Sequence, residues 1–425
     1  FTQAHSLAPW TLPSMVGMFE SAYPKGLTPG APIEQWREEM GQYRVSGEQP
    51  MLAELLQERG YATGGFVGNP LLRHRDGFLR GFDATTSYEH LAPEPGGLFE
   101  QMPFLRDAVA AWFPTLVPAP PLDTSRILTR FAGKFLGAHQ DAPFFLWVHF
   151  MDPHDPYDPP ERYRTRGGPW DVWSPASPRW GSPQYDAQRY MPGITDDERD
   201  YVQSLYNGEI SYVDECIGGI LNRLDELGLS ETTYVCVTAD HGEGLWDHER
   251  IGHGATLYED EIHVPLLLLG PEIGARRIEQ PVSTLDLTPT LAALVELPEL
   301  EAWRGVSWAE FLTEGGDAPL SPAVYANATH HPSWPDPQEA IIEGELKYLR
   351  RMESGAQELF DLDTDPRERH DMAAEHAAEI ESFEAKLDAW QNSYDSGFEA
   401  KSMTDDEQRR MEEQIDRLRA IGYVE

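Results

Sequence analysis

Residues 232–271 read TTYVCVTADHGEGLWDHERIGHGATLYEDEIHVPLLLLGP. Two apolar runs in this stretch, 234–238 and 264–269, are typical of buried strands. The loop between them carries side chains of metal-ligating types, namely Asp240, His241, Glu243, Asp247, His248 and His253. It follows the carboxyl end of a strand, where open α/β sheets place their chemistry. Asp and neutral His together suit a divalent cation, so we interpret the loop as a site rather than a polar surface segment.

The composition limits the class of function. The chain has 425 residues, of which 72 are acidic and 33 basic, for a formal net charge of −39. This charge argues against a nucleic-acid partner, which needs a basic surface. No apolar run approaches the roughly 20 residues of a membrane span, so none is predicted within this chain, and its location stays open. Cys216 and Cys236 lie in apolar segments, which favours buried free thiols over a disulfide framework.

Thr11 is the first candidate catalytic residue. Pro9 and Pro13 flank it, and residues 14–19 predict the first turns of a helix. Thr11 is therefore expected just before a helix N-terminus, where backbone N–H groups favour an anion. A hydroxyl beside a bound cation can lose its proton and attack phosphorus or sulfur. The alternative is an ordinary N-cap threonine.

A second candidate segment is residues 144–160, FFLWVHFMDPHDPYDPP. The run 144–150 predicts a buried strand, and the prolines after it predict a stiff loop at its carboxyl edge. His149 ends the strand and His154 lies in the loop. His154 could donate a hydrogen bond to an oxyanion or to a leaving oxygen. The alternative is a solvated histidine in a proline-rich loop.

Other patterns predict an αβ unit early in the chain and antiparallel strands late in it. The expected helices are 51–60, 196–227, 283–297, 368–390 and 405–421, and the expected strands are 61–67, 323–328, 339–352 and 358–362. Residues 163–194 are interpreted as a lid or specificity insertion. Glu209 and Asp214 are interpreted as structural acids. We predict a main domain over 1–315 and a C-terminal subdomain over 316–425.

Several motifs occur in one order along nearly the whole chain, and together they resemble the sulfatase family of the alkaline-phosphatase superfamily. They are APWTLPS, GYATGGFVGN, FFLWVHFMDPHDPYDPP, YNGEISYVDE, TADHGE, GHGATLYEDEIHVPLLLLGP, ELFDLDTDPRE and LRAIGYVE. The resemblance implies an α/β fold with a large mixed sheet flanked by helices and a smaller C-terminal antiparallel sheet. It also implies hydrolysis of sulfate or related esters at one divalent metal ion, which could be Ca, Mg, Mn or Zn.

The resemblance assigns roles residue by residue. Asp240 and His241 match metal ligands, and Thr11 stands at the nucleophile position beside the metal. His154 matches the histidine that binds the ester group, and His253 stands where many members have a lysine beside the leaving oxygen.

Asn69 and His149 are predicted to contact the substrate. The expected partner is an anionic ester, such as a sulfated or phosphorylated glycan or a lipid head group.

This sequence departs from the family pattern in three ways. Thr11 replaces the Cys or Ser that is converted to formylglycine, so no formylglycine is expected and Thr11 would act as an alkoxide. Residues 67–70, Val-Gly-Asn-Pro, replace Gly-Lys-Trp-His, so a cation and an imidazole that would hold a sulfate are missing. The family's first strand, with two adjacent acidic metal ligands, is expected upstream of Phe1. With Asp240 and His241 alone, a divalent ion would bind weakly.

Three functions therefore stay open from the sequence. The first is a metal-dependent hydrolase of sulfate or phosphate esters with Thr11 as nucleophile. The second is a phosphodiesterase or a transferase of the phosphoglycerol or phosphoethanolamine type, because alkoxide chemistry at Thr11 resembles theirs. The third is a catalytically silent member that binds an anionic glycan, because the formylglycine motif is lost.

Overall fold

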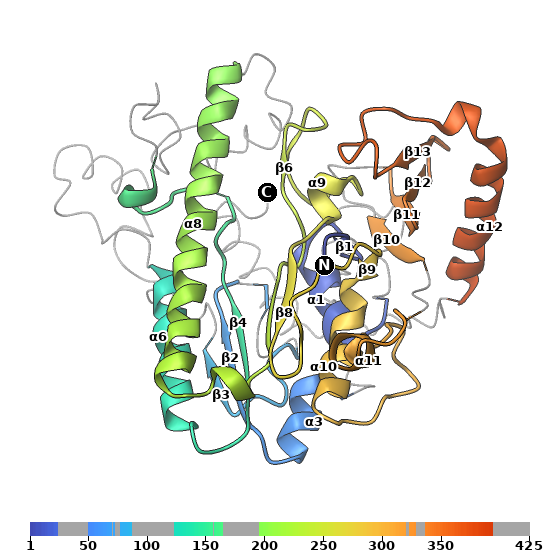
Figure 1. Ribbon diagram of the computed structural model, residues 1–425. Helices are drawn as coiled ribbons and strands as arrows, with labels where there is room; N and C mark the ends of the chain where they lie inside the picture. Colours follow the sequence, from blue (N-terminus) through green and yellow to red (C-terminus); the bar gives the residue numbers. More distant parts are fainter. Residues whose placement is uncertain are drawn as a thin grey trace, which may run out of the picture.

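The computed structural model describes residues 1–23, 50–69, 71–72, 77–86, 123–155, 157–164, 195–319, 323–328 and 336–393 (Figure 1). They form a layer of strands with helices on both faces and, beside it, a smaller antiparallel sheet with its own helix. The predicted α/β class and C-terminal antiparallel sheet are confirmed. The domain boundary at residue 315 stays a prediction.

Three parallel strands form one part of the strand layer. They pair in the order β3 (Ala84–Thr86), β2 (Ala62–Val67) and β4 (Phe144–His149). Because Val67 is opposite His149 in the register, the carboxyl ends of β2 and β4 meet at the same edge. Polar residues that directly follow β2 and β4 therefore lie close together at this edge.

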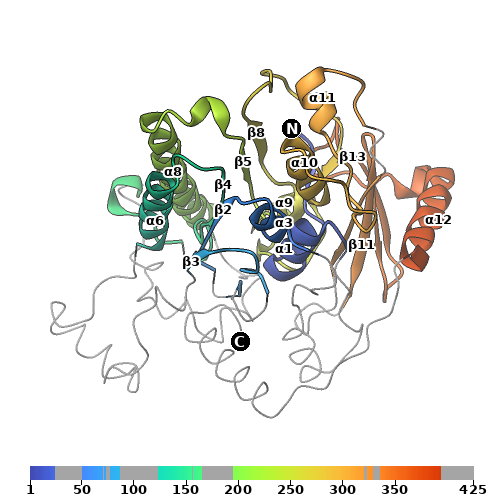
Figure 2. The same ribbon diagram turned by 90° about the horizontal axis from the view of Figure 1, so that it is seen from below.

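Two further strand pairs complete the layer. β5 (Val235–Thr238) runs antiparallel to β8 (Leu266–Leu269), and β1 (Ala4–His5) runs parallel to β9 (Val282–Ser283). Among the described residues no hydrogen-bonded ladder joins β4 to β5, although the two lie side by side (Figure 2). The predicted large mixed sheet is therefore present as neighbouring groups of hydrogen-bonded strands.

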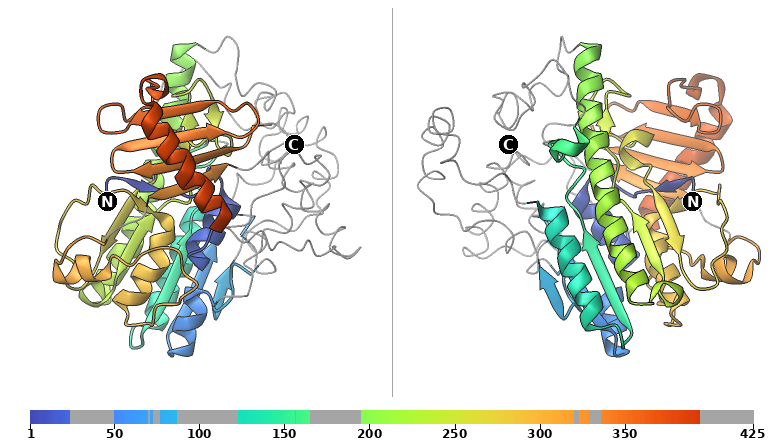
Figure 3. Two further views of the ribbon diagram at one scale, coloured as in Figure 1. Left: turned by 90° about the vertical axis from the view of Figure 1, so that its right-hand side faces the viewer. Right: turned by 60° about the vertical axis from the view of Figure 1, so that its left-hand side comes forward.

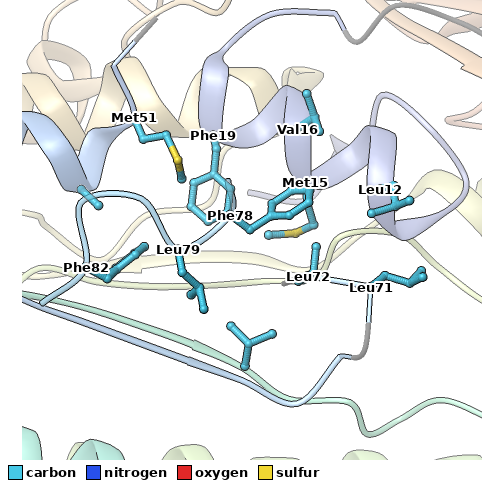
Figure 4. Close-up of a cluster of buried hydrophobic side chains, with 12 residues drawn as sticks. Leu12, Met15, Val16, Phe19, Met51, Leu71, Leu72, Phe78, Leu79 and Phe82 are labelled. Atoms are coloured by element: carbon cyan, nitrogen blue, oxygen red, sulfur yellow. The ribbon is translucent and has the colours of Figure 1, made fainter. Parts of the chain in front are cut away.

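Helices cover both faces of the strand layer. One face carries α6 (Thr124–Ala138) and α8 (Asp196–Glu226), and the other carries α1 (Thr11–Glu20), α3 (Leu52–Glu58) and α10 (Leu287–Leu294) (Figure 2). Buried apolar side chains of α1 pack against those of residues 71–72 and 78–82 (Figure 4). The cluster includes Leu12, Met15, Val16, Phe19, Leu72, Phe78, Leu79 and Phe82. This packing fixes the position of the N-terminus of α1.

The smaller sheet has four antiparallel strands with one helix packed on it (Figure 3). The strands are β10 (Val324–Ala328), β11 (Gln338–Glu343), β12 (Leu346–Arg351) and β13 (Gln357–Asp361), and the helix is α12 (Ala377–Ser393). Buried Lys347 of β12 contacts Glu259, the first residue of the short helix α9 (Glu259–Ile262), at 2.9 Å between Nζ and Oε1. This ion pair joins the smaller sheet to the main part of the molecule.

The remaining described elements are short. They are β6 (Gly244–Leu245), β7 (Ile251–Gly252), α11 (Ala309–Glu314) and the 3-10 turns Glu161–Tyr163, Ser230–Thr232, Thr284–Asp286 and Ala373–Glu375. Cys216 and Cys236 are free thiols, as predicted. Of the helices described here, none combines the length and the apolar character that a membrane span needs.

Four predicted boundaries are wrong. The helix expected over 283–297 is α-helical only at Leu287–Leu294, because a strand and a 3-10 turn precede it. Residues 339–352 form two strands, because Gly344, with φ of 62°, turns the chain between β11 and β12. The last described helix begins at Ala377 rather than at 368, because the Asp371 carboxylate accepts the Leu359 N–H and holds that segment against β13. α1 begins at Thr11 itself, because the N-cap residue with an extended backbone is Trp10. Predictions for 165–194 and 405–421 lie outside the described residues.

Candidate active site

Thr11 is buried, with 1% of its surface exposed, where α1 begins. Its Oγ1 lies 3.4 Å from His241 Nε2, and its hydroxyl is also hydrogen-bonded to the Asp240 carboxylate. The N–H groups of the first helical turn add a positive field at this position. The candidate nucleophile therefore contacts both of the predicted metal ligands.

The loop after β5 supplies these two ligands, and Gly242 fixes its path. The Gly242 N–H donates to the Glu261 carbonyl at 2.8 Å, and a Cβ at this glycine would lie 2.2 Å from the Asp260 carbonyl oxygen. Only glycine allows α9 to approach the loop this closely. His241 Nδ1 donates to the Gly242 carbonyl at 2.7 Å, so the neutral ring has its lone pair on Nε2, the nitrogen that faces Thr11.

Asp240 joins the ends of β4 and β5. Its Oδ2 lies 3.6 Å from His241 Nε2 and 3.9 Å from His149 Nε2. Burial alone would raise the pKa of Asp240, but the two imidazoles and the Thr11 hydroxyl hold that pKa well below its usual range. Asp240 is therefore a carboxylate at neutral pH.

These donors fit one side of the coordination shell of a divalent metal. Carboxylate oxygen, imidazole nitrogen and hydroxyl oxygen converge from Asp240, His241 and Thr11. Asp240 Oδ2 is buried and has no hydrogen-bond donor among the described residues, as expected of a ligating oxygen. The described part of the chain holds no group of three or more His, Cys, Asp or Glu side chains arranged around one ion. A metal here would need further oxygen ligands.

Asn69 follows β2 and is buried beside Thr11. Its Nδ2 donates to Thr11 Oγ1 at 3.4 Å, and its Oδ1 accepts the Leu71 N–H at 2.8 Å. The second bond fixes the orientation of the amide. Asn69 is predicted from the sequence as a substrate contact, and the structure places it on the candidate nucleophile.

His154 and His253 form a second group next to the first. The centroid of the His253 ring lies 4.3 Å from that of His241 and 5.1 Å from that of His154. His154 Nδ1 donates to the Asp155 carbonyl at 2.6 Å, and His253 Nδ1 faces the Glu243 carboxylate at 3.2 Å. The structure thus brings all of the predicted site residues together at one edge of the strand layer.

Glu243 is one of the metal-ligating residue types that the sequence places in this loop, but it has no individual role predicted from the sequence. Its side chain is buried, with 4% exposed, and burial raises its pKa to about 7, with an added effect of the Asp155 charge and opposing effects of His154 and His241. The β6–β7 register pairs Gly244 with Gly252, which makes residues 243 and 253 neighbours across the hairpin. Recognition of that hairpin in the sequence would have identified the pair.

Glu209 of α8 is a further buried acid nearby. Burial and the charges of Asp152, Asp155 and Glu243 raise its pKa to about 10, so it is protonated at neutral pH. Its Oε1 accepts the Asp158 N–H at 2.6 Å. This contact agrees with the interpretation of Glu209 as a structural acid.

The fold and the site together define an alkaline-phosphatase-like α/β protein with an Asp–His pair beside a buried hydroxyl. The chain belongs to the sulfatase family, because the family model described as Sulfatase matches residues 1–297. The family and the fold predicted from the sequence are therefore confirmed.

Known proteins similar to this chain carry related names. The chain is 31% identical to the uncharacterized sulfatase YidJ of Escherichia coli, over 40% of this chain and 35% of that protein. It is 25% identical to the ulvan-active sulfatase of Formosa agariphila, over 92% of this chain and 72% of that protein. The crystal structure of the phosphonate monoester hydrolase of Agrobacterium radiobacter has a TM-score of 0.65 and 21% identity, over 92% of this chain and 88% of that one. The chain spans about a third to a half of the length of the first curated relatives it matches.

Proposed function

We propose that this protein is a divalent-metal-dependent hydrolase of sulfate or phosphate esters with Thr11 as its nucleophile. The observation that carries the proposal is the convergence of Thr11 Oγ1, His241 Nε2 and the Asp240 carboxylate at the N-terminus of α1. Membership of the sulfatase family supports ester hydrolysis. The similarity to a phosphonate monoester hydrolase supports including phosphorus esters.

Asp240, His241 and Thr11 are the residues that would hold the metal. When bound, the ion would polarise an oxygen of the ester group and lower the pKa of a nearby hydroxyl.

The chain's own residues account for the bond changes. Thr11 loses its proton to solvent water, and the Oγ1 alkoxide forms a bond to sulfur or phosphorus. The bond to the leaving oxygen breaks at the same time, and that oxygen takes a proton from Nε2 of His253, whose ring is protonated on both nitrogens at this step. Asn69 donates to Oγ1 and stabilises the alkoxide, and the protonated ring of His154 donates from Nε2 to a non-bridging oxygen, since its Nδ1 already donates to the Asp155 carbonyl. Water then attacks sulfur or phosphorus and gives a proton to His253 Nε2, while the bond to Thr11 Oγ1 breaks. The alkoxide and the protonated His253 are restored, so each turnover consumes one water.

The substrate class we favour is a sulfated glycan. A relative aligned over 92% of this chain is named for activity on ulvan, and a solved structure similar in fold is a complex with D-glucosamine-2-N,6-O-disulfate. The net charge of −39 argues against a nucleic acid as the substrate.

Kinetics of the purified protein test the proposal. Aryl sulfate, aryl phosphate, phosphodiester and phosphonate esters are assayed with Mg²⁺, Mn²⁺, Ca²⁺ or Zn²⁺ and after chelation. We expect metal-dependent turnover of at least one ester and a loss of kcat of about 10³-fold or more in Thr11→Ala, because the group that attacks is gone. Thr11→Ser keeps the hydroxyl and is the matched control, with most of the activity retained.

Two results would remove the proposal. One is the absence of metal-dependent turnover on every ester, which would instead indicate a binding protein. The other is undiminished turnover in Thr11→Ala.

A further inference from the structure

A buried acid and an imidazole form a pair beside the candidate nucleophile. The two carboxylate oxygens of Glu243 lie 3.2 and 3.3 Å from His253 Nδ1. Both side chains are largely enclosed, with 4% of Glu243 and 15% of His253 exposed. When Glu243 is ionised its oxygens can only accept hydrogen bonds, so in that state Nδ1 of the ring carries the shared proton.

The surrounding elements hold this pair in one geometry. The β6–β7 hairpin places residue 243 opposite residue 253 through its Gly244–Gly252 pairing. The His253 ring lies against His241 at a centroid distance of 4.3 Å and meets His154 edge-on at 5.1 Å. Two neighbouring rings and one hydrogen bond therefore restrict the rotation of His253.

We propose that Glu243 is the positioning residue that orients His253 for proton transfer to the leaving oxygen. Its hydrogen bond keeps one proton on Nδ1 and fixes the direction of the ring, so that the protonated ring gives its other proton, on Nε2, to the leaving oxygen. The inference rests on the proposed function and adds to it the group that makes His253 effective. A buried acid with a purely structural role would not need to contact His253.

The dependence of the rate on the leaving group separates positioning from a merely structural role. A phenolate is a poor leaving group and needs the proton, whereas 4-nitrophenolate leaves readily without it. Glu243→Gln should lower kcat/KM for phenyl esters about tenfold to a hundredfold and for 4-nitrophenyl esters about threefold or less. His253→Ala should show the same pattern with a larger loss.

Glu209→Gln is the matched control. Glu209 is as deeply buried as Glu243 and lies in the same group of acids, but its hydrogen bonds are with the backbone of Asp158 and His154 and not with an imidazole ring. Its replacement by Gln should change kcat/KM for both esters by less than about threefold, within the range of changes away from the reacting atoms.

The outcomes distinguish this inference from the proposed function. Absence of turnover in the wild-type protein would overturn the proposed function. Wild-type turnover with an equal loss for both esters in Glu243→Gln, or with no loss, would overturn only the role of Glu243.

Nitrogen NMR of the full chain labelled at histidine gives a readout that needs no turnover. The His253 signals, assigned by their loss in His253→Ala, should show a protonated Nδ1 in the wild-type protein and a change in Glu243→Gln. A wild-type ring that is protonated only on Nε2 would overturn the inference.

Discussion

The residues that contact the Thr11 hydroxyl come from segments that are far apart in the sequence. Asn69 follows β2, Asp240 and His241 follow β5, and Thr11 itself begins α1. Three polar partners around one buried hydroxyl exceed what an N-cap threonine needs, because a cap bonds only to its own helix. At this scale the geometry favours a reactive group over a capping residue.

Glu209 gives a prediction for stability as a function of pH. Its pKa is about 10 in the folded protein and about 4.5 in the unfolded chain. Between these pH values the carboxyl group is protonated in the folded protein and ionised in the unfolded chain. The stability contributed by that proton is complete at low pH and is lost as the pH rises from about 4.5 towards 10. Glu209→Gln cannot lose a proton, so the Tm of the variant relative to wild type should increase from pH 5 to pH 9, by at least about 3 °C.

Calorimetry at several pH values checks this prediction. Asp214→Asn is the control, because Asp214 is exposed on the same helix. A Tm difference between Glu209→Gln and wild type that stays constant from pH 5 to pH 9 would contradict the assignment of a retained proton.

At the scale of elements, the sequence predicts the strands that carry the site. It does not predict which side chains pair with each other across neighbouring strands. The runs 144–150 and 234–238 are apolar, β-branched or aromatic, and end at polar residues, which predicts both the strands and the edge where the chemistry lies. The contact between Glu243 and His253 depends on a hairpin of two-residue strands, which is too short for any periodicity. The turn at Gly344 was not predicted, because the alternation of apolar and polar residues continues on both sides of it.

The contact between β12 and α9 gives a second stability prediction. Lys347 Nζ lies 2.9 Å from Glu259 Oε1 and 2.7 Å from Glu368 Oε1, and its side chain is fully buried. Lys347→Met would leave two buried carboxylates without their cation, which should lower the free energy of unfolding by about 3–5 kcal/mol. Urea unfolding measures this loss.

Lys386→Met is the matched control for that experiment. Lys386 pairs with Glu343 on an exposed surface, so its replacement should change the free energy of unfolding by less than about 1 kcal/mol. Equal effects of the two substitutions would show that the buried cluster does not join the two parts of the molecule.

At the scale of the whole molecule, the order of motifs predicted the architecture better than any single pattern did. The family and the fold followed from motifs spread over nearly the whole chain, and both are confirmed. The roles of the site residues stay proposals, because a motif identifies positions but not the bonds that form there. Thr11 shows this most clearly, since the family pattern has a different residue at its position.

The central claim is that the Thr11 oxygen attacks the ester. Mass spectrometry of the protein stopped during turnover of a slow aryl ester tests it most directly, with fragmentation to separate Thr11 from nearby Ser14. The account predicts a sulfuryl or phosphoryl group on Thr11 that forms only with metal present and is absent from Thr11→Ala. A covalent group on another residue, or turnover in the wild-type protein that continues unchanged in Thr11→Ala, would contradict it.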